Sequence, residues 1–445
     1  LALMRASCDT AIPGATLDRT LVQAGDRVYD VFRAWSNLEM TFDLPYHSHG
    51  EIEQDVADEA WADYPAGKPG YKYFKTPVAA RTDNDWTCTW RVPRGRVEFH
   101  AVGEAGSEVI FGRTPKGPHE LPTAMVRRRT SDTVFAASMD IIAKELEPGQ
   151  RAEEGKPGSA TIRSVRKIGD GEQVYGLVAD LVDGGREVVL VNFAGDTVTA
   201  GGWSTDAQVA LVRLRDDVLT DFYLAGGTML EGPGGRIQSA QPSLLACRTV
   251  ADGLMALANQ GTEDVKLVLE GIAEPTAAYA LSDNGRREEK LAYKADGGTL
   301  RLPALAARSQ YELVRGTQPT VVEYEAEQRR TKLEAMLREE KRLAAEARAA
   351  AEAQQKKAQQ SDVPKGSFIL VQAGDFDNQG GGKVTVSGGK TASYGDAFLN
   401  WNNPGHWLEY DITVQKEGWY KFVWKYCAES PTSRSIRVDG DYPHE

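Results

Sequence analysis

Apolar and polar residues alternate with a period of two through most of the first 310 positions. In residues 28–35, Val28, Phe32 and Ala34 lie on one side of an extended chain and Tyr29 and Val31 on the other. This period predicts β-strands. Similar short runs recur at residues 97–101, 109–111, 133–140, 161–165, 174–181, 187–193, 207–214 and 266–269.

Glycine-rich breaks separate these runs, as at residues 183–185, 200–202 and 232–235. Many short strands with turn signals between them predict a mostly β chain built as a large antiparallel β-sandwich, or supersandwich. We expect residues 21–230 to form one stack of sheets, which residues 275–313 close. Residues 187–196 are apolar on both faces and are therefore the best candidate for a core strand.

The pattern changes near Glu323, where a run rich in Glu, Lys, Arg, Ala and Gln begins and continues to Gln360. Because no Gly or Pro interrupts this run, it predicts one long helix. Leu333, Met336 and Leu343 have the spacing of a coiled-coil seam, but the stripe is thin and Glu340 interrupts it. The sequence favours a solvated linker helix, with a dimeric coiled coil as the alternative.

Alternation resumes after residue 366 and predicts a small second β-sandwich, which is incomplete because the chain stops at residue 445. The expected organisation is a large β-sandwich at 1–318, the charged linker helix at 319–362, and the truncated small β-sandwich at 363–445.

Length and charge narrow the function classes. A chain of 445 residues is long enough for two or more domains. Its net charge of −12 argues against nucleic acid as a partner, and an anionic glycan would need a local basic patch. No apolar run is long enough for a transmembrane helix. Four scattered cysteines without a CxxC pair favour buried thiols over a zinc site.

Several segments of the first 140 residues carry a family resemblance. The segments VYDVFR (28–33) and FDLPYHSHGEIE (42–53), followed by WTCTW (86–90) and the strand pair at 122–129 and 133–137, resemble the C-terminal β-sandwich of heparinase II/III-like polysaccharide lyases. That family, which includes alginate-lyase relatives, implies cleavage of a uronic-acid glycan by β-elimination. It also implies a helical toroid before the sandwich, and no paired amphipathic helices precede Leu17.

The resemblance therefore leads us to expect the C-terminal portion of a secreted lyase, extracellular or periplasmic, whose partner is the missing N-terminal toroid. Such a portion would bind an anionic polysaccharide but would be inactive alone. The alternative is a non-catalytic carbohydrate-binding scaffold that oligomerises through the charged helix.

β-Elimination needs a group that neutralises the uronate carboxylate, a base and an acid. Tyr46, His47, His49 and Arg127 are the candidate catalytic residues, because Tyr and His transfer protons and Arg clamps carboxylates. A structural interpretation stays open for each: the histidines end a strand, and Arg127 forms an internal ion pair. His47 and His49 also have the spacing of a metal-binding pair, but no third histidine supports it and no metal is expected.

The last segment resembles a carbohydrate-binding module of a kind that often carries calcium, through residues 372–377, 401–410 and 418–420. The resemblance suggests Tyr394, Trp401, Asn402 and Asn403 as sugar-binding residues, with Trp407 expected in the core. Calcium is the only candidate cofactor. Gln372 and Gly374 occupy positions where that family usually has glutamate ligands, so these two positions depart from its calcium site.

Overall fold

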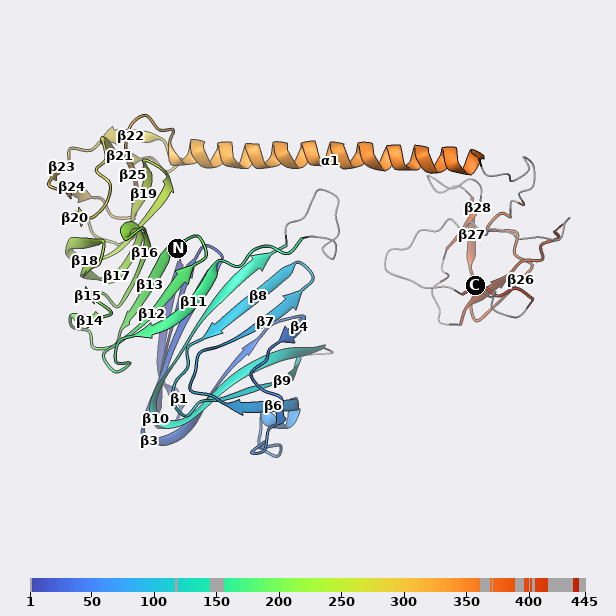
Figure 1. Cartoon of the computed structure of the whole chain (residues 1–445), viewed down its shortest axis with the longest axis horizontal. Coiled ribbons are helices and arrows are strands. Elements are labelled where there is room, and N and C mark those ends of the chain that lie inside the picture. Colours follow the sequence, from blue (N-terminus) through green and yellow to red (C-terminus); the bar gives the residue numbers. More distant parts are fainter. Residues whose placement is uncertain are drawn as a thin grey trace. The chain divides into compact units, whose positions relative to one another are not determined.

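The computed structural model describes residues 2–116, 119–144, 156–360, 369, 371–388, 396–399, 401, 405–414 and 435–439 (Figure 1). It divides into two compact units, Leu1–Arg348 and Ala349–Glu445. The larger unit holds two antiparallel sheets, and the prediction of a mostly β chain is confirmed.

The first sheet has ten strands and ends near residue 143. Its main order is β1-β2-β3-β10-β8-β7-β4, and β9, β6 and β5 extend it from one end of β10. The strands are β1 (Ala2–Ile12), β2 (Ala15–Ala24), β3 (Arg27–His47), β4 (Glu51–Glu53), β5 (Glu59–Ala60), β6 (Lys75–Arg81), β7 (Trp86–Val92), β8 (Gly95–Ala101), β9 (Glu108–Lys116) and β10 (His119–Ala143), with one 3₁₀ turn, η1 (Tyr71–Tyr73).

The second sheet has fifteen strands and includes the predicted core strand at β13, which is buried at every position after Arg186. The strands are β11 (Ile162–Ile168), β12 (Val174–Leu181), β13 (Arg186–Asn192), β14 (Val198–Ala200), β15 (Trp203–Thr205), β16 (Val209–Arg215), β17 (Val218–Gly232), β18 (Gly235–Ala251), β19 (Leu254–Asn259), β20 (Val265–Glu270), β21 (Ala277–Leu281), β22 (Arg287–Lys290), β23 (Lys294–Asp296), β24 (Thr299–Leu305) and β25 (Ser309–Val314).

Residues 21–230, expected to form one stack of sheets, fall in both sheets, because the first sheet ends with β10 and β11 begins the second. The alternating pattern marks the strands but does not say which sheet each one joins. That assignment follows from pairing, and β11 pairs with β12, the next strand along the chain.

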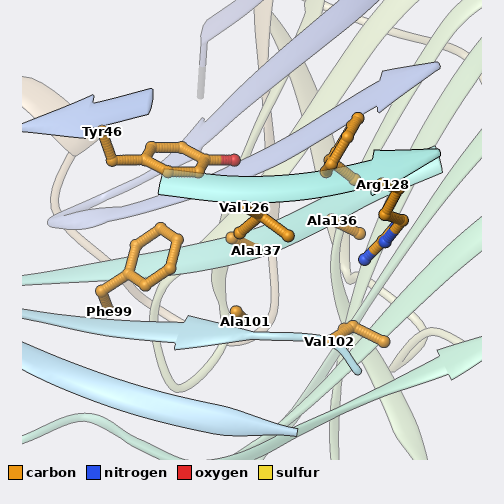
Figure 2. Close-up of a pocket in the computed structure, with 9 residues that line it drawn as sticks. Tyr46, Phe99, Ala101, Val102, Val126, Arg128, Ala136 and Ala137 are labelled. Carbon is orange, nitrogen blue, oxygen red and sulfur yellow. The ribbon is translucent and has the colours of Figure 1, made fainter. Parts of the chain in front are cut away.

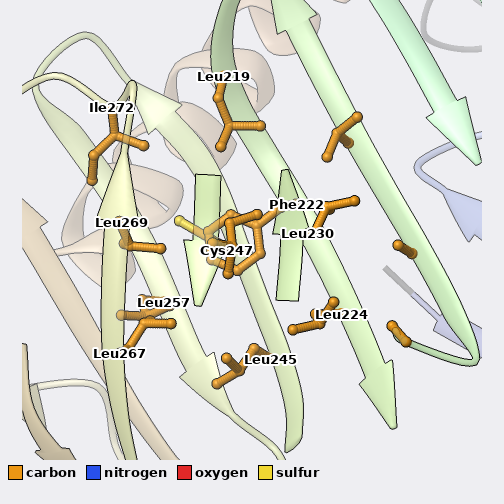
Figure 3. Packing of buried hydrophobic residues seen from close by; sticks show 14 of the residues in the cluster. Leu219, Phe222, Leu224, Leu230, Leu245, Cys247, Leu257, Leu267, Leu269 and Ile272 are labelled. Carbon is orange, nitrogen blue, oxygen red and sulfur yellow. The ribbon is translucent and has the colours of Figure 1, made fainter. Parts of the chain in front are cut away.

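The three largest apolar clusters hold most of the larger unit together. One lies between the sheets and joins Tyr29 and Val31 of β3 to Leu177 of β12 and Val189 of β13. A second lies on the other face of the first sheet, around Trp90 and Phe99. The third belongs to the second sheet; Figure 3 shows its side chains converging from several strands, among them Leu219, Phe222, Leu224, Leu230, Leu245, Cys247, Leu257, Leu267, Leu269 and Ile272.

A buried ionic network reinforces the contact between the sheets. Arg27 of β3 donates to both carboxylate oxygens of Glu187 in β13, at 3.0 and 2.6 Å, and the Tyr29 hydroxyl donates to the same carboxylate. The Glu187 side chain is only 2% exposed. Asp140 of β10 likewise accepts a hydrogen bond of 2.9 Å from the Thr161 hydroxyl. These bonds satisfy polar groups that would otherwise be costly to bury.

The predicted helix is confirmed as α1 (Val321–Gln360), two residues longer at its start than the pattern indicated. A capping box explains the start: the Glu323 amide donates to the Thr320 hydroxyl at 3.1 Å, and the Thr320 amide donates to the Glu323 carboxylate at 2.8 Å. None of the helices in the described part of the chain combines the length and apolar character that crossing a bilayer requires.

The smaller unit contains two short antiparallel ribbons among its described residues. They are formed by β26 (Asn378–Gly380) with β29 (Trp407–Glu409), and by β27 (Thr385–Gly388) with β28 (Asp396–Leu399). The sequence predicts three segments that meet at residues 318 and 362. The two compact units do not test these boundaries, so they stay a prediction.

Candidate functional site on the first sheet

The predicted catalytic residues lie where β3 pairs with β10, but on both faces of the sheet. Tyr46 is opposite Ala124, His47 is opposite Thr123, and Arg127 is opposite Asp43. Because successive side chains of a strand point to opposite faces, Tyr46 and His47 cannot serve one site. His47 and Arg127 share a face, which we call the outer face: the face of β3, β9 and β10 that carries His47, Thr114, Thr123 and Arg127.

Tyr46 points into the core, opposite to the outer face. It borders a cavity of about 10 Å³, and Figure 2 shows it there with Phe99, Val126 and Arg128. A space of this size holds about one water molecule. Burial and the nearby Asp30 carboxylate raise the pKa of Tyr46 well above its usual value. This position does not suit the predicted acid–base role, because a polysaccharide does not reach the ring.

Arg127 is engaged by the protein itself. Its Nε and Nη2 donate to the two carboxylate oxygens of Asp43 at 2.8 and 2.9 Å, and Nη2 lies 3.1 Å from the Tyr71 hydroxyl. The guanidinium also lies over the Trp61 ring, 4.6 Å from its centroid. The fork that was expected to clamp a substrate carboxylate therefore clamps Asp43, and the structural interpretation of Arg127 describes its geometry better.

His47 ends β3 with its side chain on the exposed outer face. Its Nδ1 lies 2.9 Å from the Thr123 hydroxyl and 3.3 Å from the Thr114 hydroxyl, and these two hydroxyls lie 2.9 Å apart. Thr123 donates its own hydrogen to the Leu121 carbonyl at 3.1 Å. Thr123 can therefore only accept from its other neighbours, which assigns the imidazole proton to Nδ1.

This tautomer leaves the lone pair on Nε2, the nitrogen that the threonines do not touch. Partial burial, with a smaller effect from the Lys116 ammonium, lowers the pKa of His47 below its usual value. The imidazole is therefore neutral at pH 7. A neutral, oriented imidazole with an available lone pair can act as a general base.

The η1 turn brings cationic and aromatic groups to the outer face, where its Tyr71 contacts Arg127. A Cβ on Gly112 would come within 2.7 Å of the Phe74 ring, and Gly112 lies across Thr123 from His47. Phe74 therefore lies two strand spacings, about 10 Å, from His47. Tyr73, which precedes Phe74, is 53% exposed, and the Lys72 ammonium lies 4.7 Å from the Tyr73 ring centroid.

His49 takes a different position from the one that an unbroken strand would give. β3 ends at His47 and β4 begins at Glu51, so His49 lies in the intervening turn, with Gly50 at a φ of +92°. Glu53, which was expected on the same face, pairs with Arg91. Within the described ranges, no three His, Cys, Asp or Glu side chains form a group that could hold a metal ion.

Of the two tryptophans that the structure describes in the smaller unit, the exposed one is not the one that the sequence indicated. Trp407 is 46% exposed, whereas Trp401 is partly buried and donates from Nε1 to the His406 carbonyl at 3.0 Å. A Cβ on Gly380 would meet the Trp407 ring at 2.6 Å, so the ring lies flat on that glycine. The core position expected for Trp407 is thus wrong. Tyr394, Asn402 and Asn403 lie outside the described residues.

The residues suggested for calcium do not fit the ion. Of the two positions, only Gln372 has a side-chain oxygen. The Asp375 carboxylate accepts a hydrogen bond of 3.1 Å from the backbone N–H of Gln372. The backbone N–H of Asp375 donates to the backbone carbonyl of Gln372 at 3.0 Å. Calcium takes six to eight oxygen ligands. This turn is stabilised by its own hydrogen bonds and offers far fewer.

Sequence reasoning did not find the groups that shape the outer face: Asp43, Tyr71, Thr114, Lys116 and Thr123. Their only signal is strand register, which becomes visible once β3, β9 and β10 are aligned. Comparison with protein-family models and with curated proteins finds no match to this chain.

Proposed function

We propose that this chain is the β-sandwich portion of a secreted polysaccharide lyase that acts on a uronic-acid glycan, and that its outer face binds the glycan. The proposal is supported most by His47, whose hydroxyl partners leave Nε2 available as a base. The family resemblance of the sequence motivates the lyase class. The contribution of this chain is glycan binding, and a helical domain of the kind that the resemblance implies would complete the catalytic site.

The outer face has the chemistry that such a ligand requires. Lys116 and Lys72 are exposed cations in a chain of net charge −12, and they supply the local basic patch that an anionic glycan needs. The exposed Tyr73 ring offers a stacking surface for a sugar. Lys75 contributes less, because it is paired with Glu120.

Binding can be tested with the full chain and three anionic polysaccharides: alginate, polygalacturonate and heparan sulfate. In affinity electrophoresis at low salt, we expect at least one to retard the protein, while neutral dextran does not. Lys116→Glu should weaken retardation about tenfold, and Lys266→Glu, the same charge change at an exposed position of β20, should leave it unchanged. If no anionic polysaccharide retards the chain, or if the two variants behave alike, the proposal fails.

Catalysis is followed separately through the ultraviolet absorbance of an unsaturated uronate product. We expect the chain alone to bind without forming this product. Sustained turnover would overturn the assignment of the chain as the binding portion.

A second candidate function is a non-catalytic carbohydrate-binding scaffold that oligomerises through α1. It is favoured by Leu333, Met336 and Leu337, which are 56%, 41% and 46% exposed on the helix. Sedimentation velocity tests it: a dimer that Leu333→Lys and Leu337→Lys together convert to a monomer supports the scaffold. A monomer at all concentrations excludes it.

A further inference from the structure

A pocket of about 210 Å³ opens on the first sheet, away from the residues of the outer face discussed above. It is lined by Asp9 of β1, Thr16 of β2, and Trp35, Ser36 and Asn37 of β3. The volume is smaller than the roughly 300 Å³ at which pockets for drug-sized ligands begin. It therefore suits a single compact unit of a larger ligand.

Two irregularities of the sheet create this pocket, one on each side of Thr16. In β1, residues 9–11 bulge out opposite the single residue Thr16, between the pairs Cys8–Leu17 and Ile12–Ala15. In β3, residues 36–39 bulge out opposite the single residue Ser131, between the pairs Trp35–Asp132 and Met40–Thr130. Bulges redirect side chains and are frequent beside functional sites.

The indole wall of the pocket is held in place from outside. The Arg33 guanidinium lies over the Trp35 ring, 5.1 Å from its centroid. Arg33 is itself held by both carboxylate oxygens of Asp132, at 3.1 and 2.6 Å, and by the Glu172 carbonyl at 2.6 Å. Trp35 lines the pocket and Arg33 does not, so the part of the indole ring that faces the pocket is not covered by Arg33. A ligand there meets an aromatic surface that is already oriented.

The remaining walls define the chemistry of the ligand. Asp9 and Asn37 are exposed, and in the described part of the chain the Asp9 carboxylate forms no ion pair. Together with the Thr16 hydroxyl they offer acceptors and donors for several hydroxyl groups. An aromatic wall, hydroxyl-binding groups and a negative charge fit a polyhydroxylated ligand without a carboxylate.

We propose that this pocket binds one neutral pyranose unit of a glycan. Trp35 stacks on the C–H face of the sugar, Asp9 and Asn37 bind its hydroxyls, and the Asp9 charge disfavours a uronate. The pocket is distinct from the outer face in position and in the class of sugar that it selects. The inference does not rest on the proposed function, because it concerns other residues and a neutral sugar instead of an anionic one.

Saturation-transfer NMR with the full chain tests the proposal. The probes are the methyl glycosides of glucose, galactose and mannose, with methyl glucuronide as the acidic comparison. We expect at least one neutral glycoside to bind with a Kd of about 1–10 mM and methyl glucuronide to bind at least about tenfold more weakly. Equal binding of the acidic and neutral glycosides, or no binding of any neutral glycoside at about 50 mM, overturns the proposal.

Variants locate the binding. Trp35→Ala should weaken it by about tenfold or more, Trp35→Phe should retain it within about threefold, and Asp9→Asn should reduce the discrimination against glucuronide. Trp407→Ala removes an exposed indole of the smaller unit and should leave glycoside binding unchanged. Asn37→Leu, at an exposed position, tests the pocket if Trp35→Ala does not fold. Binding that survives both Trp35→Ala and Asn37→Leu, or that Trp407→Ala abolishes, places the sugar elsewhere and refutes the assignment.

Discussion

Two regions of the first sheet treat their polar groups in opposite ways. Where the second sheet covers β3, Arg27 and Tyr29 together saturate the buried Glu187 carboxylate. On the outer face, the threonines engage only Nδ1 of His47, and Nε2 stays available. A closed network of buried charges stabilises one arrangement of two sheets, whereas an open one can exchange protons with a ligand.

Arg127 shows that a position on the outer face is not enough for a binding role. Its guanidinium is only 16% exposed and its charge is matched by Asp43, so it resembles the closed network more than it resembles His47. The comparison teaches that availability of a polar atom, rather than residue type, separates structural from functional candidates.

Glu187→Ala should lower the free energy of unfolding by about 3–5 kcal/mol, because it leaves the buried Arg27 without its counter-charge. Chemical denaturation monitored by circular dichroism measures the change. Asp180→Ala, which removes the partner of Arg186 in a more exposed pair, is the control and should cost at most about 1 kcal/mol. Equal losses of unfolding free energy in the two variants would contradict the conclusion that the buried Glu187 network stabilises the protein more than an exposed ion pair does.

Asp43→Asn should lower the free energy of unfolding by about 1.5–3 kcal/mol, because it replaces a charged acceptor of Arg127 with a neutral amide. The same variant removes a negative charge from the outer face, so it should not weaken the binding of anionic polysaccharide, since the Arg127 cluster is structural. Denaturation and affinity electrophoresis measure the two properties. Weaker glycan binding without a loss of stability would return Arg127 to the list of ligand-binding residues.

Added salt should separate the two kinds of site. Raising the ionic strength from about 0.01 to about 0.15 M shortens the Debye length from about 30 to about 8 Å. We expect the affinity of the outer face for a polyuronate to fall several-fold, because Lys116 and Lys72 are exposed. The stability difference between wild type and Glu187→Ala should hardly change, because that pair is buried. Salt-independent glycan binding would argue against recognition by these lysines.

The smallest effect concerns the protonation of His47. Its titration, followed by NMR of the imidazole, should have a midpoint below that of an unperturbed histidine, because burial and Lys116 disfavour the imidazolium and lower its pKa. Lys116→Gln should raise this midpoint. Since the folded-state pKa lies below the unfolded value, His47 lowers stability as the pH falls through the unfolded pKa, and this loss levels off below the folded pKa. A midpoint that Lys116→Gln leaves unchanged would show that the ammonium has no influence.

The sequence predicted most of the strands and placed α1 within two residues, yet it placed the site less well. His47 emerged from the pattern as a candidate, but its threonine partners come from strands 67 and 76 positions away. Tyr46 and Arg127 were chosen for their chemistry, and burial or an internal partner removed each of them from the surface that a glycan can reach. Local periodicity contains no information about either effect.

The alternation of residues along the chain is sufficient to predict its strands, the position of the charged helix and the apolar face of each strand, because these properties depend on neighbours in sequence. The contacts between distant strands are needed to show that β10 ends one sheet and β11 begins another, that Asp43 pairs with Arg127, and that two bulges open a pocket beside Trp35. Those outcomes depend on register between distant strands, and a shift of one residue would turn each side chain to the opposite face.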